Sequence, residues 1–442
     1  MRKLVLCLIA TFQAIIAIQA QTEEFTVDGI QVVLRHTPKE VVSAKLFIKG
    51  GTSNYSKEKE GIETFALNLA VSGGTTSKDK YTFAGEAEQI GAQISAASAM
   101  DYSSIDLTCV KMFWDNSWNL FADAIVNPSF DSEEFDLLKE QLISGAKQRE
   151  SDPDQHLRQL SLQGAFPGKN YSKIPDGSTA SLSSITLEEV KAYYKNTIGK
   201  QRVFLVVVGD VSKEDLTAKI KASLVNLPQG TPAIVEPRTA LKTPSTISED
   251  REMATNYIRG MMDAPKVNSD EGVAMALAMD IMRDRLFVEL RTKRSLTYAP
   301  GAGYASTLVN SPYSTLYASS IDPKQSMQVM VDEVNKLRTE GFSAKELLDK
   351  KQSFLTEYYI GLETTESIAN QLGISEMQGG WESLDTFTKE VDEVTIDELN
   401  AAFKKYSNSI KWTYLGDKKL VTDDDFKQPQ KITKKKVKKI KG

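Results

Sequence analysis

The chain has 442 residues and a formal net charge of −5, and it contains 26 Gly, 14 Pro, two Cys and two His. This length gives room for two or three domains with large hydrophobic cores, and the low Gly and Pro content excludes a low-complexity or collagen-like protein. Two cysteines exclude a disulfide framework, and the seven lysines among the last twelve residues conceal an acidic body that disfavours nucleic-acid binding.

The first twenty residues are typical of a secretory signal peptide. Arg2 and Lys3 precede an uncharged run from Leu4 to Ile18, and the small residue Ala20 stands at the expected cleavage point. The run is shorter than the ~20 residues that a helix needs to span a bilayer. We therefore expect residues 1–20 to be removed and the mature protein to be exported across the inner membrane, into the periplasm.

The spacing of apolar residues predicts the elements of the first half. Apolar runs and alternations predict strands at 30–35, 42–48, 93–99, 103–110 and 202–210. Helical spacing predicts helices at about 60–72, 82–90, 112–125, 131–150 and 186–196. Four prolines between Pro228 and Pro244 then predict an extended linker over residues 228–250, because each removes a backbone donor and restricts its neighbour.

The second half of the sequence repeats the first. Three segments recur in order at offsets of 209, 207 and 212 residues: Ile185-Thr-Leu-Glu-Glu-Val as Val394-Thr-Ile-Asp-Glu-Leu, Gly209-Asp210 as Gly416-Asp417, and Phe130-Asp-Ser-Glu-Glu-Phe as Phe342-Ser-Ala-Lys-Glu-Leu. Chance similarity of Thr-x-x-Glu helix caps would explain one match but not three. We therefore predict an α+β protein with two homologous α/β domains, 21–227 and 251–425, each a mostly antiparallel sheet with helices packed on one face.

Residues 426–442 form a basic tail in this prediction. Its lysines repel one another, so we expect it to be disordered. A lysine near an anionic surface contributes about 1 kcal/mol to membrane attraction. Contact with a membrane surface and simple solvation of the tail both remain open.

Duplicated α/β domains of about 210 residues in this order resemble the pitrilysin/insulinase family of zinc peptidases. The chain is most similar to the two-domain chains of the mitochondrial processing peptidase and its bacterial relatives. The resemblance covers nearly all of residues 25–420. It implies that the two domains form half of a clamshell.

The first motif that carries the resemblance runs from Gly50 to Thr75, and its helix follows the step Gly61-Ile62. Active members have His-x-x-Glu-His there, with two imidazoles on one helix face as zinc ligands and the Glu activating the bound water. The corresponding places here are Thr64, Leu67 and Asn68, and the third ligand, a Glu about 76 residues later, is replaced by Ser144 or Gly145. The resemblance thus implies a degenerate metal site and no cofactor in this chain.

The two histidines do not replace the lost ligands. His36 ends a predicted strand, where we expect a surface or edge residue. His156 follows Asp152-Pro153-Asp154 at a helix start, where we expect a solvated or capping role.

The second motif runs from Arg285 to Tyr298. In the family, an Arg at this helix end and a Tyr seven residues later reach the zinc site from the far half of the clamshell and hydrogen-bond the substrate and its oxyanion. The resemblance assigns these roles to Arg291 and Tyr298, although Thr292 replaces the usual acidic residue. The alternative interpretation is structural, with Arg291 capping its helix and Tyr298 packing on a sheet.

A third feature is the predicted strand that contains Ser95, Ala96 and Ala97. In the family the edge of this strand pairs with the substrate backbone by strand addition. An ordinary strand inside a sheet fits the same three residues.

Some relatives divide the work between a zinc-bearing chain and a chain that carries only the Arg/Tyr pair. The resemblance therefore implies a non-catalytic subunit of an exported zinc metallopeptidase, inactive alone. It would form a heterodimer with a zinc-bearing homologous chain and contribute Arg291 and Tyr298 to peptide hydrolysis there. The alternative is a peptide-binding or scaffold pseudopeptidase with no role in hydrolysis. A self-sufficient zinc peptidase would need ligands that the sequence lacks.

Overall fold

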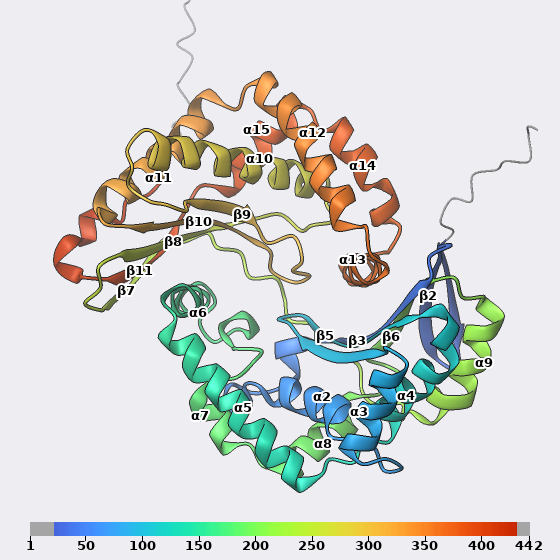
Figure 1. Ribbon diagram of the computed structural model, residues 1–442. Helices are drawn as coiled ribbons and strands as arrows, with labels where there is room; N and C mark the ends of the chain where they lie inside the picture. Colours follow the sequence, from blue (N-terminus) through green and yellow to red (C-terminus); the bar gives the residue numbers. More distant parts are fainter. Residues whose placement is uncertain (1–21, 431–442) are drawn as a thin grey trace, which may run out of the picture.

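The computed structural model describes residues 22–430, which form two domains, each built on one sheet (Figure 1). The first domain comprises β1 (Thr22–Val27), β2 (Ile30–His36), β3 (Val41–Lys49), α2 (Ile62–Ser72), α3 (Lys80–Gln89), β4 (Gln93–Ser98), β5 (Tyr102–Val110), α4 (Trp114–Val126), α5 (Ser132–Ser151), α6 (Pro153–Ala165), α7 (Thr179–Ser184), α8 (Leu187–Thr197), β6 (Val203–Gly209) and α9 (Lys213–Ser223).

The second domain comprises β7 (Ser245–Asp250), β8 (Asn256–Asp263), α10 (Asp270–Leu286), the π-helix η6 (Phe287–Thr292), β9 (Gly301–Tyr304), β10 (Tyr313–Ser320), α11 (Pro323–Glu340), α12 (Ala344–Gly361), α13 (Thr365–Gln378), α14 (Ser383–Glu393), α15 (Ile396–Tyr406) and β11 (Lys411–Gly416). None of the helices in residues 22–430 has the length and apolar character needed to cross a membrane. The expected signal peptide lies outside the described residues.

The two sheets share one topology. The first sheet has the order β1-β2-β6-β3-β5-β4 and the second has the order β7-β11-β8-β10-β9. In each sheet one pair of strands is parallel, β2 with β6 and β7 with β11, and every other neighbouring pair is antiparallel. The second sheet is therefore a copy of the first without β1, which confirms the prediction of two homologous, mostly antiparallel domains.

The sequence repeats mark the same structural points in both domains. The Thr186 hydroxyl and the Glu189 carboxylate form a capping box at the start of α8, and Thr395 with Glu398 forms its counterpart at α15. Gly209 and its counterpart in the second half end β6 and β11. The repeats were detectable because helix caps depend on a few neighbouring residues.

Each domain packs its own helices on one face of its sheet. The core of the first domain contains Phe65 of α2, Trp118 of α4 and Val190 of α8, all packed on the sheet. The core of the second domain is formed in the same way by α10, α11 and α15. These two large clusters are separate, so each domain has its own hydrophobic core.

The opposite face of each sheet is covered by a helix from the other domain (Figure 1). Leu372 of α13 packs with Phe47 and Phe204 on the first sheet, and Leu162 of α6 packs with Met261 on the second. The central strand β6 is covered on both faces and all seven of its residues are buried. This explains its continuous apolar sequence, because only strands with one solvated face alternate apolar and polar residues.

Glycines allow these exchanged helices to approach the sheets closely. A Cβ atom on Gly373 of α13 would lie 2.1 Å from the Phe47 ring, and one on Gly164 of α6 would lie 2.3 Å from the Ile247 side chain. The two sheets turn toward each other the faces that do not carry their own domain's helices, with α6 and α13 lying between them (Figure 1).

Two expected boundaries differ from the structure. Residues 228–244 contain no helix or strand, as expected for a linker, but 245–250 form β7 because they pair in parallel with β11. Residues 426–430 belong to the folded second domain rather than to the tail. Phe426 is buried, and Arg338 Nη1 donates a hydrogen bond to the carbonyl of Gln430 (2.8 Å). The remainder of the expected tail lies outside the described residues.

We predict that Gly373→Ala lowers the free energy of unfolding by about 1–3 kcal/mol, because the added methyl group must displace the buried Phe47 ring. Gly85→Ala is the matched control. Gly85 also lies inside a helix, but a Cβ there meets nothing within 4 Å, so the higher helix propensity of Ala should stabilise the protein by up to about 1 kcal/mol. Urea unfolding measures both, and equal stabilisation by the two substitutions would contradict the packing described for α13.

Candidate functional site

The place expected to have lost its zinc ligands lies at the start of α2, beside the loop 174–177. Thr64 is buried, and its Oγ1 donates a hydrogen bond to the carbonyl of Pro175 (2.8 Å). Leu67 is buried in the core, and Asn68 Nδ2 donates to the carbonyl of Thr64 in its own helix (2.7 Å). All three side chains are therefore committed to contacts within the fold.

The loop 174–177 lies directly against the start of α2. Gly61 precedes this helix with a φ of 87°, and a Cβ atom on it would lie only 2.7 Å from the Cα atom of Gly177. Arg149 of α5 donates from Nη2 to two carbonyls of the loop, at 3.1 and 3.2 Å. The loop is thus bound by Thr64, which stands in the first ligand position, and by Arg149 of α5, the helix that would carry the third ligand.

The residues at this place do not fit a zinc ion. Ser144 is exposed, Gly145 has no side chain, and Arg149 brings a positive charge to the loop that Thr64 contacts. Within residues 22–430, no group of three or more His, Cys, Asp or Glu side chains is placed to hold a metal ion. Since zinc binds through deprotonated or neutral N, O and S ligands, no step of hydrolysis is assigned to this place.

The histidines lie elsewhere. His36 ends β2 with a partly exposed side chain, 3.7 Å from Asp210, as expected of an edge residue. His156 differs from expectation, because its Nε2 lies 2.9 Å from Glu249 of β7 and it joins α6 to the second sheet. Burial alone would raise the pKa of Glu249, but the hydrogen bond and charge of His156, together with Arg251, lower it.

A buried carboxylate fixes the first turn of α2. Glu63 is 1% exposed and accepts hydrogen bonds from Asn54 Nδ2 (3.0 Å), from Ser103 of β5 and from Tyr193 of α8. Burial raises the pKa of Glu63, and the three hydrogen bonds together with the charge of Arg202 oppose this rise. The network ties the degenerate site to the sheet and to α8.

The structure brings Arg291 and Tyr298 together after the end of α10. Arg291 lies in η6, a π-helix, which is a conformation frequent at functional sites. Its guanidinium lies 4.3 Å from the centroid of the Tyr298 ring and 4.9 Å from that of the Phe287 ring, within the range of cation–π attraction. Tyr298 is 78% exposed and therefore does not pack on a sheet, as the structural interpretation required.

The backbone that carries Tyr298 is anchored. Leu296 and Thr297 are buried, and the Leu296 N–H donates to the carbonyl of Leu290 (2.9 Å). Ser320, at the end of β10, donates from Oγ to the carbonyl of Leu296 (2.8 Å). The ring of Tyr298 is thus presented to solvent from a fixed segment rather than from a free loop.

β4 is an edge strand, since among the described strands it pairs only with β5. Ser95 and Ala97 are exposed, whereas Ala96 packs against the core on the helix face. A hollow of about 460 Å³ lies beside the end of the strand and contains the ion pair between Lys45 and Asp106 (2.9 Å). The unpaired backbone of such an edge is available for another strand.

Sequence reasoning did not identify Arg149 or the loop 174–177. Arg149 lies four residues after Gly145, so helix spacing places it one turn further along α5 and could have drawn attention to it. The loop contacts could not be found in this way, because residues more than a hundred positions away from Thr64 make them.

Two family models match consecutive stretches of the chain. The model described as "Insulinase (Peptidase family M16)" matches residues 31–174. The model described as "Peptidase M16 inactive domain" matches residues 184–354. The two matches together extend from β2 into α12.

Individual proteins give the same picture. An uncharacterized zinc protease of Rickettsia felis is 24% identical over 353 residues, which are 78% of this chain and 85% of the relative. A protein of Helicobacter pylori named as a non-peptidase homolog, YmxG, is 22% identical over 340 residues, 74% of this chain and 76% of that one. The beta subunit of the Dictyostelium discoideum mitochondrial-processing peptidase is 20% identical over 200 residues, 45% of this chain and 43% of the subunit.

A solved structure shows that the fold is shared. The crystal structure of a peptidase M16 inactive domain from Pseudomonas fluorescens superposes with a TM-score of 0.82 at 20% sequence identity. The superposition covers 90% of this chain and 98% of the other. It supports the two-domain architecture and, at this identity, says nothing about activity.

We predict that the purified chain holds far less than one zinc per chain, also after incubation with zinc chloride and desalting, because the ligand places cannot coordinate the ion. Elemental analysis by mass spectrometry measures the content. One zinc per chain that a chelator removes, with loss of peptidase activity, would refute the assignment of a degenerate site.

The raised pKa of Glu63 predicts a pH dependence of stability. Because the folded state binds the proton more tightly than the unfolded state, the contribution of Glu63 to stability is largest below the ordinary pKa of 4.5 and falls as pH rises toward the folded-state pKa. Each unit of difference corresponds to about 1.4 kcal/mol. Urea unfolding between pH 4.5 and 8 should therefore show a steeper decline for the natural chain than for Glu63→Gln; parallel curves would mean that the carboxylate does not titrate as described.

Proposed function

This chain belongs to peptidase family M16, the insulinase family, and from that premise we propose that it is a non-catalytic subunit of an exported zinc metallopeptidase. It pairs with a zinc-bearing homologous chain and contributes Arg291 and Tyr298 to the active site of that partner. Residues 184–354, which include both of these side chains, match the inactive-domain model of the family.

The observation that carries the proposal is the contrast between the two domains. In the first, the places of the zinc ligands are occupied by side chains bound to the fold. In the second, Arg291 and Tyr298 stay together, and Tyr298 is exposed on an anchored segment. Because the Tyr298 ring is mostly exposed, its burial contributes little to stability.

The two side chains have the chemistry that peptide hydrolysis needs. The attacked carbonyl becomes an oxyanion in the transition state, and a positioned hydroxyl or guanidinium stabilises the oxyanion more than the carbonyl of the ground state. The Tyr298 hydroxyl makes no hydrogen bond with any described residue, and Arg291 forms no ion pair with an acid there. Both groups are therefore free to bind a substrate held by the partner.

The same arrangement supports an extended peptide as the substrate and a homologous chain as the partner. The free edge of β4 suits an extended peptide that adds as a further strand, with Ser95 and Ala97 beside it. Members of the family act in complexes, and one relative of this chain is named as the beta subunit of such a peptidase. The signal-like residues 1–20 support export to the periplasm.

A peptide-binding or scaffold protein with no role in hydrolysis is the second candidate. The Helicobacter pylori relative named as a non-peptidase homolog favours it. This candidate would use the sheet edge and the two-domain body but would not require the Arg291–Tyr298 pair.

The test is a reconstituted complex. The chain is used to capture its zinc-bearing partner from cells, and peptide cleavage is measured with the natural chain and with variants. Tyr298→Phe removes only one hydroxyl, so kcat should fall by about 10²–10³ while assembly is unchanged. Arg291→Ala should also raise KM, because its charge contacts the substrate before the transition state. Tyr81→Phe, at an 81%-exposed tyrosine of α3, is the matched control and should have no effect.

Two results would overturn the proposal. The first is that no zinc-bearing chain of this family is captured. The second is that both variants assemble normally and the complex cleaves peptides at the unmodified rate. In the second case the pair is structural and the scaffold function takes its place.

A further inference from the structure

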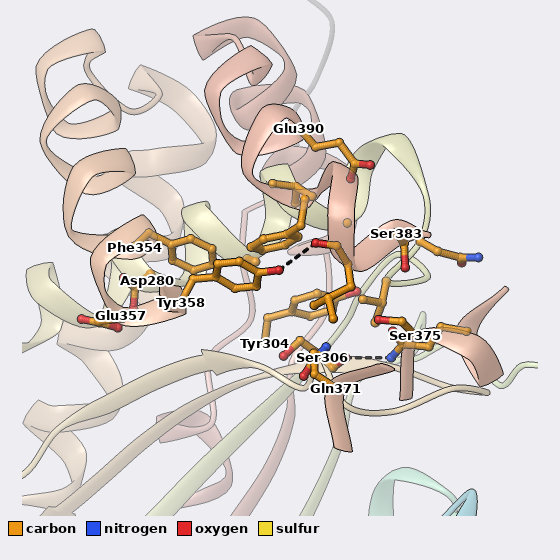
Figure 2. A pocket seen from close by; sticks show the side chains of 18 of the residues that line it. Asp280, Tyr304, Ser306, Phe354, Glu357, Tyr358, Gln371, Ser375, Ser383 and Glu390 are labelled. Carbon is orange, nitrogen blue, oxygen red and sulfur yellow. Dashed lines mark hydrogen bonds between the residues drawn. The ribbon is translucent and has the colours of Figure 1, made fainter. Parts of the chain in front are cut away.

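The second domain contains a cavity of about 410 Å³ that the proposed function does not use (Figure 2). It lies between α10, α12, α13, α14 and β9. Four aromatic side chains form much of its wall: Tyr304, Phe354, Tyr358 and Phe387. This volume is in the range of sites that bind small molecules.

The cavity corresponds to the degenerate metal place of the first domain. The strand orders make α10 the counterpart of α2, and the offset of 212 residues between Phe130 and Phe342 places Glu357 of α12 opposite Gly145 of α5. Gly272, Ala276 and Glu357 line the cavity. In the first domain the loop 174–177 contacts Thr64 at the corresponding place.

The charges in the cavity are unbalanced. Asp280 and Arg283 both line the cavity and form an ion pair with each other (2.5 Å), and Asp280 also lies 3.0 Å from Lys350, so these charges are balanced. Glu357 makes no ion pair or side-chain hydrogen bond with any residue in 22–430, and Glu390 accepts only from Thr386 Oγ1 (2.6 Å). Figure 2 shows these two carboxylates on different sides of the Tyr358 ring. Both residues are exposed, so they give the rim of the cavity two negative charges that have no cationic partner among the described residues.

The two tyrosine hydroxyls of the aromatic wall already make hydrogen bonds within the fold, whereas Gln371 of α13 faces the cavity without such a bond to a described residue. The Tyr358 hydroxyl donates to the carbonyl of Leu384 (2.9 Å), and the Tyr304 hydroxyl donates to the carbonyl of Pro265 (3.0 Å). Their hydroxyl protons are therefore already used, and the rings offer apolar and π surfaces to a ligand. Gln371 of α13 also lines the cavity and can orient a polar group of a ligand.

We propose that this cavity binds a small organic cation, an ammonium group carried on an apolar or aromatic body. The aromatic rings bury the body and attract the cation through their π faces. Glu357 and Glu390 supply the opposite charge. An anion of the same shape meets repulsion from both carboxylates, so the site discriminates by charge.

The test titrates the full chain with three probes of one shape: phenethylamine, 2-phenylethanol and phenylacetate. Ligand-observed NMR and calorimetry at low salt measure the affinity. Phenethylamine should bind with a Kd of about 1 mM or tighter, at least about fivefold more tightly than the alcohol, and phenylacetate should not bind.

Variants locate the site. The double substitution Glu357→Gln and Glu390→Gln should reduce the affinity for the amine to that of the alcohol. Glu363→Gln, an equal change of charge at an exposed residue outside the cavity, should leave it unchanged. Ala276→Leu fills the cavity and should abolish the binding of phenethylamine and of 2-phenylethanol. Thermal unfolding checks that each variant is folded. The proposal is overturned if the alcohol binds as tightly as the amine, or if the double variant or Ala276→Leu binds the amine as the natural chain does.

Discussion

Two helices, α6 and α13, each cover the sheet of the domain to which they do not belong, and the arrangement of the whole molecule depends on this exchange. Each contact is made by small and apolar residues, with a glycine at the point where the helix comes nearest to the sheet. The exchange buries the second face of both sheets, so neither domain retains its complete apolar contacts without the other. It also fixes the edge strand β4 relative to the second domain, since β4 belongs to the sheet that α13 covers.

The two domains share one fold but differ in the functional groups that they present. In the first domain, the places of the zinc ligands are filled by contacts within the fold. Thr64 and Arg149 both donate hydrogen bonds to the loop 174–177. The second domain keeps Arg291 and Tyr298 in contact beside a π-helix and keeps an open, acidic cavity between its helices. The proposed role rests on this difference: the second domain offers Arg291 and Tyr298, whereas the described residues at the start of α2 offer no zinc ligand.

The sequence predicted most features that depend on neighbouring residues. Capping boxes at Thr186 and Thr395, the apolar run of β6 and the repeat offsets all follow from local patterns, and they were sufficient for the two-domain fold. The family resemblance supplied the candidate site residues, and the structure brings Arg291 and Tyr298 together. The family models match residues 31–174 and 184–354.

Features that depend on distant contacts were not predictable. The exchange of α6 and α13, the hydrogen bond between His156 and Glu249, and the pairing of β7 with β11 join residues far apart in the sequence. No periodicity in one segment shows which sheet its apolar face will cover. The cavity of the second domain likewise forms only after five elements have assembled around it.

The most direct measurement is photo-crosslinking from position 298 within the assembled complex. A benzophenone amino acid replaces Tyr298 in one preparation and the exposed Tyr81 in another, and mass spectrometry identifies the crosslinked peptides. If the second domain completes the active site of a partner, position 298 should crosslink to the partner's helix that carries His-x-x-Glu-His, and position 81 should not. Absence of that crosslink from position 298, in a complex that assembles as the natural one does and whose natural form cleaves peptides, would contradict a role of this chain in the partner's active site.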